Sequence, residues 1–391
     1  MTVSVFRLLP WEYSVRNLFR RPMRTALTLA GLTVVVLLVL VVVGFIHGMQ
    51  KSLSMSGDPQ VALAFSLGMG KNLEYSSIPM RTGDLLAASV DGIQERYRQA
   101  YISPELYLAT DVKLARSDRA TMGLVRGVTP SILLVRRLVE IEGGNWPESG
   151  EVLVGRLAAT KMGAESNQVA VGQTLTLEGR TWRISGLFSA GGAAFESEIW
   201  CRLDELQQAM KRQDLSLVAA TLAPDGDFAD LDLFCKERLD LELQAIREPE
   251  YYSELQKDYR PVRMLAWLLV LLISGAGIFA GLNTMHGAIV GRTAELSMLQ
   301  TVGFSRRAVL VALIQEGVFL AAAASLIASA VAIVFVNGMA VRFTMGAFTL
   351  HIDSTAILVG CGTGLLLGML GTLPPALRAL RMPIVDALKA V

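Results

Sequence analysis

The chain has few cysteines, few charged residues and none of the short motifs that mark several enzyme classes. Only three cysteines occur among 391 residues, and none forms a C-x-x-C pair. A G-x-x-x-x-G-K-[ST] phosphate-binding loop, an H-E-x-x-H zinc motif and a G-x-S-x-G elbow are all absent. The three histidines are scattered along the sequence and form no ligand pair. These absences argue against a metalloprotease, a thiol redox enzyme or a protein that hydrolyses ATP by itself.

Charge is also scarce, because Asp, Glu, Lys and Arg make up 18% of the chain and the formal net charge is +1. No cluster of basic and aromatic side chains points to nucleic acid as a partner. Cys201 and Cys235 fall in one long polar region, where a disulfide is permitted if that region faces an oxidising compartment. Their spacing matches no disulfide framework and favours two unpaired thiols, but the sequence leaves their pairing open.

Hydrophobic residues, by contrast, make up 52% of the chain, and its mean hydropathy is +0.45. Four apolar stretches occupy residues 26–46, 264–290, 308–336 and 354–373, and about 20 apolar residues suffice for a helix to cross a membrane. The first stretch is uncharged, too long for a signal peptide and not followed by a small-x-small cleavage site, which indicates a retained anchor. No Asp, Glu, Lys or Arg lies well inside these apolar cores, which argues against an ion-driven pump.

The arginines and lysines that flank the stretches predict the orientation of the chain. Cytoplasmic segments of membrane proteins carry an excess of Lys and Arg near the ends of their spans. Three segments carry this excess here, and four spans place all three on the same side. They are the N-terminal tail (Arg7, Arg16, Arg20, Arg21, Arg24), the loop after span two (Arg292, Arg306, Arg307) and the C-terminal tail (Arg378, Arg381, Lys389). Both termini are therefore predicted to be cytoplasmic, with the long polar region outside.

The long polar region mixes helix and strand patterns, which predicts an α+β domain. Residues 173–187 alternate as a hairpin turning at Glu178-Gly179, and residues 151–154 and 198–201 are typical of buried strands. Helices are expected over 84–99, 203–212 and 228–246, with 68–80 as a flexible excursion. From residue 250 the pattern predicts a helix that runs into span two and is kinked at Pro261.

Two short cytoplasmic segments have helical patterns of their own. The first precedes span one and is predicted to lie in the membrane interface, with Arg16 and Arg20 on its polar face and Leu8, Trp11, Val15 and Leu18 on its apolar face. The second follows span two, where Leu296, Leu299 and Val302 form an apolar stripe that Gly303 ends as a C-cap. A short helix between two spans is a good lever for a cytoplasmic motor, although a plain amphipathic connector fits the spacing as well.

Small residues recur at intervals of four in two of the apolar stretches. Span two has Gly277 and Gly281, and span four has Gly360, Gly364 and Gly368. Such stripes let helix backbones approach closely. The spacing fits a dimer interface and packing within one subunit equally well.

The loop after span two resembles the coupling region of FtsX/MacB-type ABC transporter permeases. That family commonly shows Arg-x-x-Glu-Ile-x-x-Leu-Arg-Ala-Leu-Gly-x-Ser, followed by a Glu in the next span. The matching positions are Arg292, Glu295, Leu296, Leu299, Gly303 and Ser305, with Glu316 as the following Glu, while Gln300 replaces a common Arg. Residues 375–388 are similar to the family's C-terminal pattern. Residues 16–25, 150–155 and 171–173 also resemble it, so the likeness extends over nearly the whole chain.

The resemblance implies a membrane α-helical protein with four transmembrane helices (1+3) and a large α+β extracytoplasmic domain inserted between spans one and two. It implies a homodimeric permease in the inner membrane that works with two copies of a cytoplasmic ABC ATPase. ATP and Mg²⁺ then bind to the ATPase, and this chain holds no cofactor, metal or catalytic site. A periplasmic adaptor or substrate protein and membrane lipid are the further partners that it implies.

Three functions follow from the resemblance. The first is export or extrusion of a substrate by transmitting ATPase motion across the membrane to the outer domain. The alternatives are a permease that extracts lipoproteins or lipids, and a relay of the FtsX kind that activates a cell-wall hydrolase without transport. The large outer domain favours the first two.

The predicted domain organisation can be stated by residue number. The tail and interfacial helix occupy 1–25 and the outer domain 48–262, and the coupling loop follows span two. The full division is 1–25, span one 26–47, outer domain 48–262, span two 263–290, coupling loop 291–307, span three 308–337, outer loop 338–353, span four 354–374 and tail 375–391.

Overall fold

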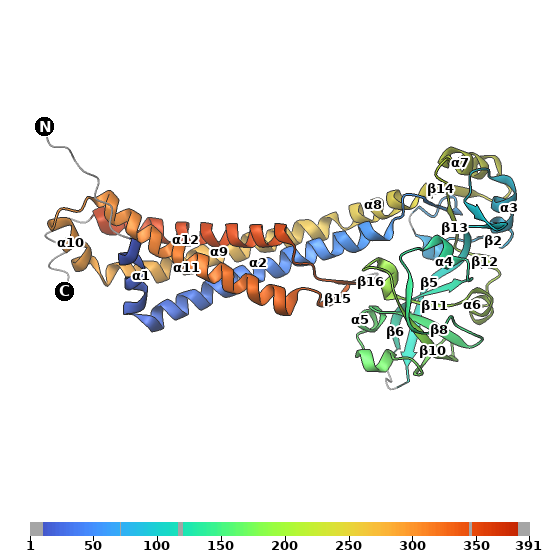
Figure 1. Ribbon diagram of the computed structural model, residues 1–391, viewed down its shortest axis with the longest axis horizontal. Helices are drawn as coiled ribbons and strands as arrows, with labels where there is room; N and C mark the ends of the chain where they lie inside the picture. The colour runs from blue at the N-terminus through green and yellow to red at the C-terminus, as the bar shows by residue number, and fades with distance from the viewer. Residues whose placement is uncertain (1–10, 71, 116–119, 344–345, 382–391) are drawn as a thin grey trace. The chain divides into compact units, whose positions relative to one another are not determined.

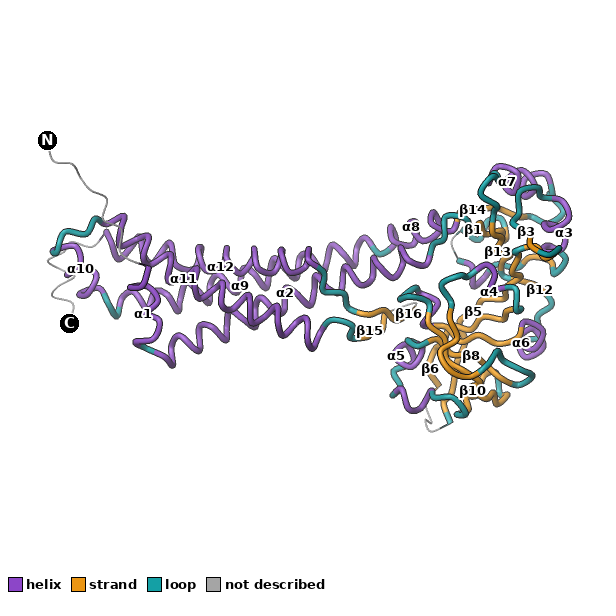
Figure 2. The backbone as a smooth tube through the Cα atoms, viewed as in Figure 1, coloured by secondary structure: helices purple, strands orange, loops and turns teal. Residues whose placement is uncertain are grey.

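The computed structural model describes residues 11–70, 72–115, 120–343 and 346–381, and it divides into two compact units (Figure 1). The first unit comprises Met1–His47, Pro261–Gly338 and Leu350–Val391. The second comprises Gly48–Arg260 and Met339–Thr349. Helices make up the first unit, whereas the large sheet lies in the second (Figure 2).

Four helices of the chain are long and apolar enough to cross a membrane, judged by length and composition over the described residues. They are Pro22–Ser56 (α2), Arg260–Val290 (α9), Arg306–Val331 (α11) with its π-helical continuation Ala332–Val336 (η4), and Ser354–Arg381 (α12). Two short helices, Trp11–Arg20 (α1) and Thr293–Thr301 (α10), are the others in the described part of the helical unit. In the most apolar window of α9 only 17% of residues are buried, against 39% in each of the others. Most residues in these apolar windows are therefore not buried inside the subunit. Exposed apolar side chains of this kind suit contact with lipid.

The helix of span one is longer than the predicted span, and the helix that enters span two is interrupted close to the predicted kink. The helix that contains span one begins at Pro22 and continues to Ser56, and Gly48–Ser56 belongs to the second unit. The helix predicted to run from residue 250 into span two with a kink at Pro261 is two helices, because Glu248–Asp258 (α8) ends before α9 begins at Arg260. Pro261 has no N–H to donate and its ring crowds the carbonyl four residues earlier, so the helix is interrupted there.

The predicted outer loop over 338–353 forms a β-hairpin. Strands Ala340–Phe343 (β15) and Gly346–Thr349 (β16) pair antiparallel, and both belong to the second unit. Close packing holds the hairpin there, since a Cβ on Gly48 of α2 would lie 2.3 Å from the Thr349 carbonyl oxygen. Only glycine fits at that position of the helix.

The second unit is built on a ten-stranded mixed sheet in the order β14-β1-β13-β5-β6-β11-β8-β10-β7, with β9 pairing to β10 and β5. Its β8–β10 and β6–β11 pairs are parallel, and its other pairs are antiparallel. The strands are Val61–Ser66 (β1), Ile102–Leu114 (β5), Ala120–Val128 (β6), Glu140–Gly144 (β7), Glu151–Gly155 (β8), Thr174–Leu177 (β9), Arg180–Ser189 (β10), Glu198–Arg202 (β11), Leu217–Thr221 (β13) and Leu243–Arg247 (β14).

Shorter elements surround this sheet. Two small strand pairs are Ile78–Pro79 (β2) with Asp214–Leu215 (β12), and Glu95–Arg96 (β3) with Gln99–Ala100 (β4). The helices are Thr82–Ser89 (α3), Ile132–Val135 (α4), Ala158–Met162 (α5), Leu203–Met210 (α6), Phe228–Glu237 (α7) and α8, with single 3-10 turns at Leu73–Tyr75 (η1), Ser166–Val169 (η2) and Ala194–Ser197 (η3).

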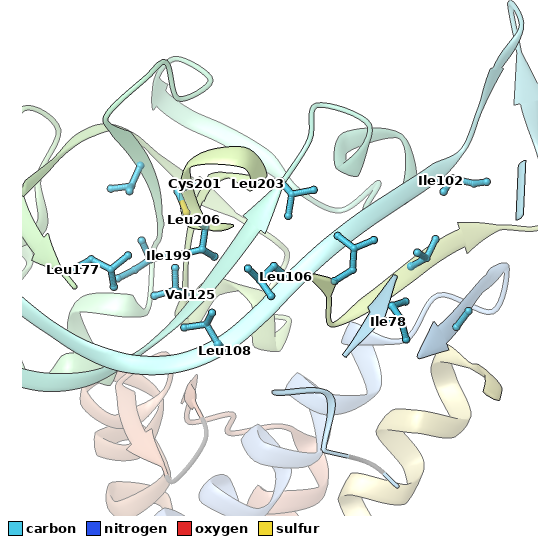
Figure 3. Packing of buried hydrophobic residues seen from close by; sticks show 14 of the residues in the cluster. Ile78, Ile102, Leu106, Leu108, Val125, Leu177, Ile199, Cys201, Leu203 and Leu206 are labelled. Carbon is cyan, nitrogen blue, oxygen red and sulfur yellow. The ribbon is translucent and has the colours of Figure 1, made fainter. Parts of the chain in front are cut away.

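Both faces of the large sheet are buried, each in a core of its own. Successive residues of a strand point to opposite faces, so Leu63 of β1 joins one core while its neighbours Ala62 and Ala64 join the other. One core includes Leu106, Leu108, Val125, Ile199 and Leu206 (Figure 3). The other contains Phe188, Trp200, Tyr251 and Tyr252. This double burial explains why β1 reads as an unbroken apolar run.

The structure confirms part of the predicted secondary structure of this unit. The hairpin is β9–β10, and its turn residues Glu178 and Gly179 both have positive φ, +48° and +72°, as a type I′ turn requires. The strands at 151–154 and 198–201 and the helix at 203–212 are present as β8, β11 and α6.

Two predicted helices are too long, and the flexible excursion is largely wrong. The helix over 84–99 ends at Ser89, and that over 228–246 ends at Glu237 because residues 243–247 pair with β1 as β14. Within 68–80, Leu73, Ser76 and Ile78 are buried and β2 pairs with β12. Pairing partners that are distant in sequence override local periodicity in these segments.

Cys201 and Cys235 are both buried and are free thiols. Burial raises the pKa of both, that of Cys235 to about 12. A thiol that stays protonated is a poor nucleophile. The two side chains therefore act as small core residues.

We expect Gly155→Ala and Gly83→Ala to have opposite effects on thermal stability. A Cβ on Gly155 would lie 2.3 Å from the Glu196 carbonyl oxygen, so the backbone must shift, at a cost on the order of 1–3 kcal/mol. A Cβ on Gly83 in α3 meets only ordinary contacts at 3.9 Å, and alanine is favoured over glycine in a helix by roughly 0.5–1 kcal/mol. Thermal unfolding of the full-length protein, followed by tryptophan fluorescence, should show a lower midpoint for Gly155→Ala only. Equal midpoints would contradict the packing described for β8.

Candidate functional site

The predicted coupling loop contains α10 and two well-defined ends. Val302 follows the last turn, and Gly303 takes φ of +106°, a left-handed conformation that suits glycine and stops a helix. The Phe304 amide donates to the Leu299 carbonyl oxygen at 3.1 Å, which closes this end. The Ser305 Oγ then accepts from the Ala308 amide at 3.2 Å and caps α11. Gly303 and Ser305 thus set the turn between α10 and α11.

The apolar residues of α10 divide between two directions. Leu296 is buried, and Leu299 packs partly into the same cluster, which includes Ile289 and Leu313. Val302 does not continue that stripe as predicted, because it lies past the helix end and is 77% exposed. Met298 is also exposed, at 62%, as is Glu295. One side of α10 therefore belongs to the helical core, and the other presents two bare apolar side chains and a carboxylate.

A buried polar node anchors this region. Arg292, at the N-cap of α10, donates from Nη2 to both carboxylate oxygens of Glu316 on α11, at 3.0 and 3.2 Å. Asn17 of α1 donates from Nδ2 to Glu316 Oε2 at 2.8 Å. The Arg292 and Glu316 side chains are 9% and 12% exposed, so water screens the pair little. The node joins α1, the start of α10 and α11 through one carboxylate.

Glu316 qualifies the prediction that the apolar stretches contain no charge well inside them. It stands 10 residues after the first residue of α11, about three helical turns along. Its charge is balanced locally by Arg292, so it is placed as a structural partner of the loop arginine. A carboxylate in an apolar helix, close in sequence to a loop arginine, is the signal that could have predicted this pair.

The first helix makes a contact that its sequence pattern did not predict. The buried side chains of α1 are Ser14 and Asn17, and the Ser14 Oγ donates to the Ala312 carbonyl oxygen of α11 at 3.1 Å. Arg16 and Arg20 are exposed, as predicted for the polar face. Val15 and Leu18 of the predicted apolar face are half-buried, and Leu8 lies outside the described residues. Trp11 begins the helix. The helix predicted to lie in the membrane interface is thus also hydrogen-bonded to α11.

Arginines gather beside the node in a small groove of about 50 Å³. Arg24 of α2 donates from Nη2 to the Thr284 carbonyl oxygen of α9 at 2.7 Å. Thr284 lies six residues before the last residue of α9, so this bond adds a contact between α2 and the body of α9. The groove is lined by Arg20, Arg21, Arg24 and Arg292 together with Glu295 and Glu316.

The glycines predicted to pack helices face other helices of the same chain. A Cβ on Gly277 of α9 would lie 2.9 Å from Val35 Cγ1 of α2, and one on Gly281 would lie 3.6 Å from the Cα of Gly371 on α12. On α12, a Cβ on Gly364 would overlap the Ser325 Oγ of α11, and one on Gly368 would lie 2.6 Å from Ala321 Cβ. These positions are occupied by packing within the subunit.

No group of three or more His, Cys, Asp or Glu side chains in the described part of the chain is arranged to hold a metal ion.

We expect Glu316→Gln to destabilise the protein by on the order of 2–3 kcal/mol, since it leaves the Arg292 guanidinium buried without a counter-charge. The matched control is Glu295→Gln, an exposed carboxylate on α10 whose loss should change stability by less than about 0.5 kcal/mol. Titration of the purified protein with a denaturing detergent measures both. The double variant Arg292→Gln with Glu316→Gln should recover part of the loss, and equal midpoints for the two single variants would refute the node.

Comparison with known protein families assigns this architecture to a family. The family model of the MacB-like periplasmic core domain matches residues 25–232, more than half of the chain. The model of the FtsX-like permease C-terminal matches residues 267–384. No curated protein matches the chain.

Two solved structures are similar at low identity. The periplasmic region of MacB from Actinobacillus actinomycetemcomitans is 10% identical, with 51% of this chain and 94% of that chain covered and a TM-score of 0.40. The extracellular domain of the noncanonic ABC-type transporter YknZ from Gram-positive bacteria is 11% identical, with 48% and 99% covered and a TM-score of 0.37. Both scores are below 0.5, so the assignment rests on the two family models. On those matches, the chain belongs to the FtsX/MacB-type ABC transporter permeases.

Proposed function

We propose that this chain is the membrane subunit of an ATP-driven ABC complex, and that it transmits the motion of a separate ATPase to its α+β unit to export or extrude a substrate. The observation that carries this proposal is α10. It is short, it leaves Met298, Val302 and Glu295 exposed, and the next residues on either side lead into α9 and α11. An exposed apolar pair beside a carboxylate, on a chain of this family, is a suitable docking point for the ATPase.

The buried node supports transmission from that point. A displacement of α10 acts on Arg292, and the Arg292–Glu316–Asn17 bonds pass it to α11 and α1 together. Breaking the node would leave a buried charge without its partner, which is costly, so the parts are expected to move as one body. Packed helices with buried polar contacts carry such coupling without deforming continuously.

The chain passes between the helical unit and the α+β unit at four points. The α2 helix ends in residues of the α+β unit, and α9 begins at Arg260, the last residue of the first segment of that unit. The β15–β16 hairpin, inserted between α11 and α12, supplies the other two. Motion of these helices therefore reaches the α+β unit directly through covalent continuity.

The proposed arrangement in the membrane is one crossing by α2 and three by α9, α11 and α12. It places both termini and α10 on the cytoplasmic side of the inner membrane, which agrees with the arginines around α1 and α10. We propose two copies of this subunit and two ATPase copies, with ATP and Mg²⁺ bound to the ATPase. A periplasmic adaptor would receive the substrate. The largely exposed apolar surface of α9 is available to lipid and to the second copy.

We expect Val302→Asp to abolish docking of the ATPase without unfolding the permease. The side chain is 77% exposed, so a carboxylate costs little in the subunit alone, but it would be desolvated in an apolar contact with a partner. Co-purification with the native ATPase, identified by mass spectrometry, and the ATPase rate of the reconstituted complex are the measurements.

The matched control is Leu239→Asp, an equally bare leucine at 81% exposure in the α+β unit. It should leave both readouts at wild-type level, whereas Glu295→Lys on α10 should weaken them. If Val302→Asp retains the ATPase as Leu239→Asp does, α10 is not the docking point.

We also expect the purified subunit alone to hydrolyse no ATP, because its sequence lacks a phosphate-binding loop. Phosphate release at saturating Mg-ATP, before and after addition of the ATPase partner, measures this. Turnover by the subunit alone, resistant to removal of every co-purifying ATPase, would overturn the proposal.

A further inference from the structure

The α+β unit contains a cavity of about 320 Å³ that the coupling function does not use. Its walls come from the end of α2 (Leu53), strands β5 and β6, helix α8 and the β15–β16 hairpin. All of its lining residues lie in the second unit. Its size falls in the range of small-molecule sites, which are concave and mostly apolar with a few placed polar groups.

Aromatic rings form much of the lining. Tyr259, directly after α8, meets Phe343 of β15 edge-on, with ring centroids 5.1 Å apart, and Phe343 meets Phe348 of β16 at 6.0 Å. Tyr251 and Tyr252 of α8 make a further edge-to-face pair at 5.1 Å. Burial raises the pKa of both of these tyrosines, so their hydroxyls stay neutral. The cavity thus offers ring faces and edges to an apolar or aromatic body.

Behind the rings is a buried ion network with an excess of negative charge. Arg126 donates from Nε and Nη2 to Glu198, at 2.7 and 2.6 Å, and from Nη1 to Glu105 at 2.5 Å. Arg136 is paired with Glu248. Each of these five side chains is at most 5% exposed. Three carboxylates face two guanidinium groups, so the network carries one negative charge more than it balances.

The network leaves polar atoms without a full complement of partners. The Arg136 Nη2 is 3.7 Å from Glu105 Oε1, and that oxygen makes no hydrogen bond within the described structure. Four of the five side chains line the cavity, namely Arg126, Arg136, Glu198 and Glu248. Glu105 is not part of the lining. A buried carboxylate excess is costly unless a cation approaches it.

We propose that this cavity binds an amphiphile with an apolar or aromatic body and one protonated amine, and that it is the substrate-capture site of the permease. The ammonium group would face the ion network and the tyrosine rings, which attract cations through their π faces. A fatty acid or another anion would add a second uncompensated negative charge and is disfavoured. The part of the inference that names a substrate rests on the proposed export function, but binding to the cavity does not.

The walls of the cavity also explain how binding would be linked to the motor. Leu53 lies on α2, and the apolar part of that helix is in the helical unit. Tyr259 immediately precedes α9. A shift of either helix along its axis would therefore reshape the lining. Capture and release would follow from opening and closing these walls.

The test uses three fluorescent probes with one common body: 1-pyrenemethylamine, 1-pyrenemethanol and 1-pyrenecarboxylate. Binding to the full-length permease in lipid nanodiscs is measured against empty nanodiscs. We expect saturable binding of the amine at one site per chain, roughly tenfold tighter than that of the alcohol and tighter still than that of the acid. Equal affinities of the amine and the alcohol, or the absence of a saturable component, would overturn the proposal.

Two filling variants locate the site. Leu53→Trp and Leu255→Trp, on two different helices of the lining, should each weaken amine binding by roughly tenfold or more, while Leu239→Trp on the exposed surface should not. Glu248→Gln removes the excess charge and should reduce the preference for the amine over the alcohol. If that variant fails to fold, the filling variants still decide the matter, and unchanged binding in both of them would refute the site.

The result is separable from the coupling proposal. Val302→Asp should leave pyrenemethylamine binding at wild-type level, because the residue lies outside the cavity lining. If the wild-type permease binds the amine but no ATPase docks on it, the coupling function alone is refuted. If the ATPase docks but the amine does not bind, the cavity proposal alone is refuted.

Discussion

The ion pair between Arg292 and Glu316 is the interaction on which the arrangement of the helical unit depends. A carboxylate three turns inside an apolar helix cannot remain unpaired, and the loop arginine at the start of α10 is the group that meets it. Asn17 donates a hydrogen bond to the same carboxylate and so connects α1 to α11. The short helix α10 is thereby held at both ends, by the pair at its start and by the Gly303–Ser305 turn at its end. A segment so held can pass on a push, whereas a flexible loop would absorb it.

Buried charges also stabilise the α+β unit, but there they form a larger network. Its sheet is covered on both faces, and Arg126 joins β6 to β5 and β11 through Glu105 and Glu198. Arg136 and Glu248 connect α4 and α8 to this group. The carboxylate excess that results lies beside an aromatic cavity. One network therefore both organises the core and determines which charge the cavity accepts.

Much of the helical part was predictable because its causes are local. The four apolar stretches follow from composition, and Gly303 is predicted as a helix stop from its place directly after the stripe of Leu296, Leu299 and Val302. The hairpin at Glu178-Gly179 was found because positive φ at both turn residues is a local requirement. The helices over 84–99 and 228–246 were predicted too long because β14 forms only when β1, far away in the sequence, is present to pair with it. Ser14 and Asn17 were missed because a polar face turned toward another helix has no signature in the helix's own periodicity.

The sequence by itself determined the apolar helices, the positions of their charged flanks and the coupling-region pattern from Arg292 to Ser305. These depend on side-chain solubility and backbone conformation, which act within a few residues. Only the tertiary structure decided that Glu316 meets Arg292 and Asn17, that residues 339–349 fold into a hairpin of the α+β unit, and that three buried glutamates face two arginines beside a cavity. Those features arise where segments more than twenty, and in places hundreds, of residues apart come into contact. Local patterns do not decide them, because the energy of a buried charge depends on which partner the fold brings to it.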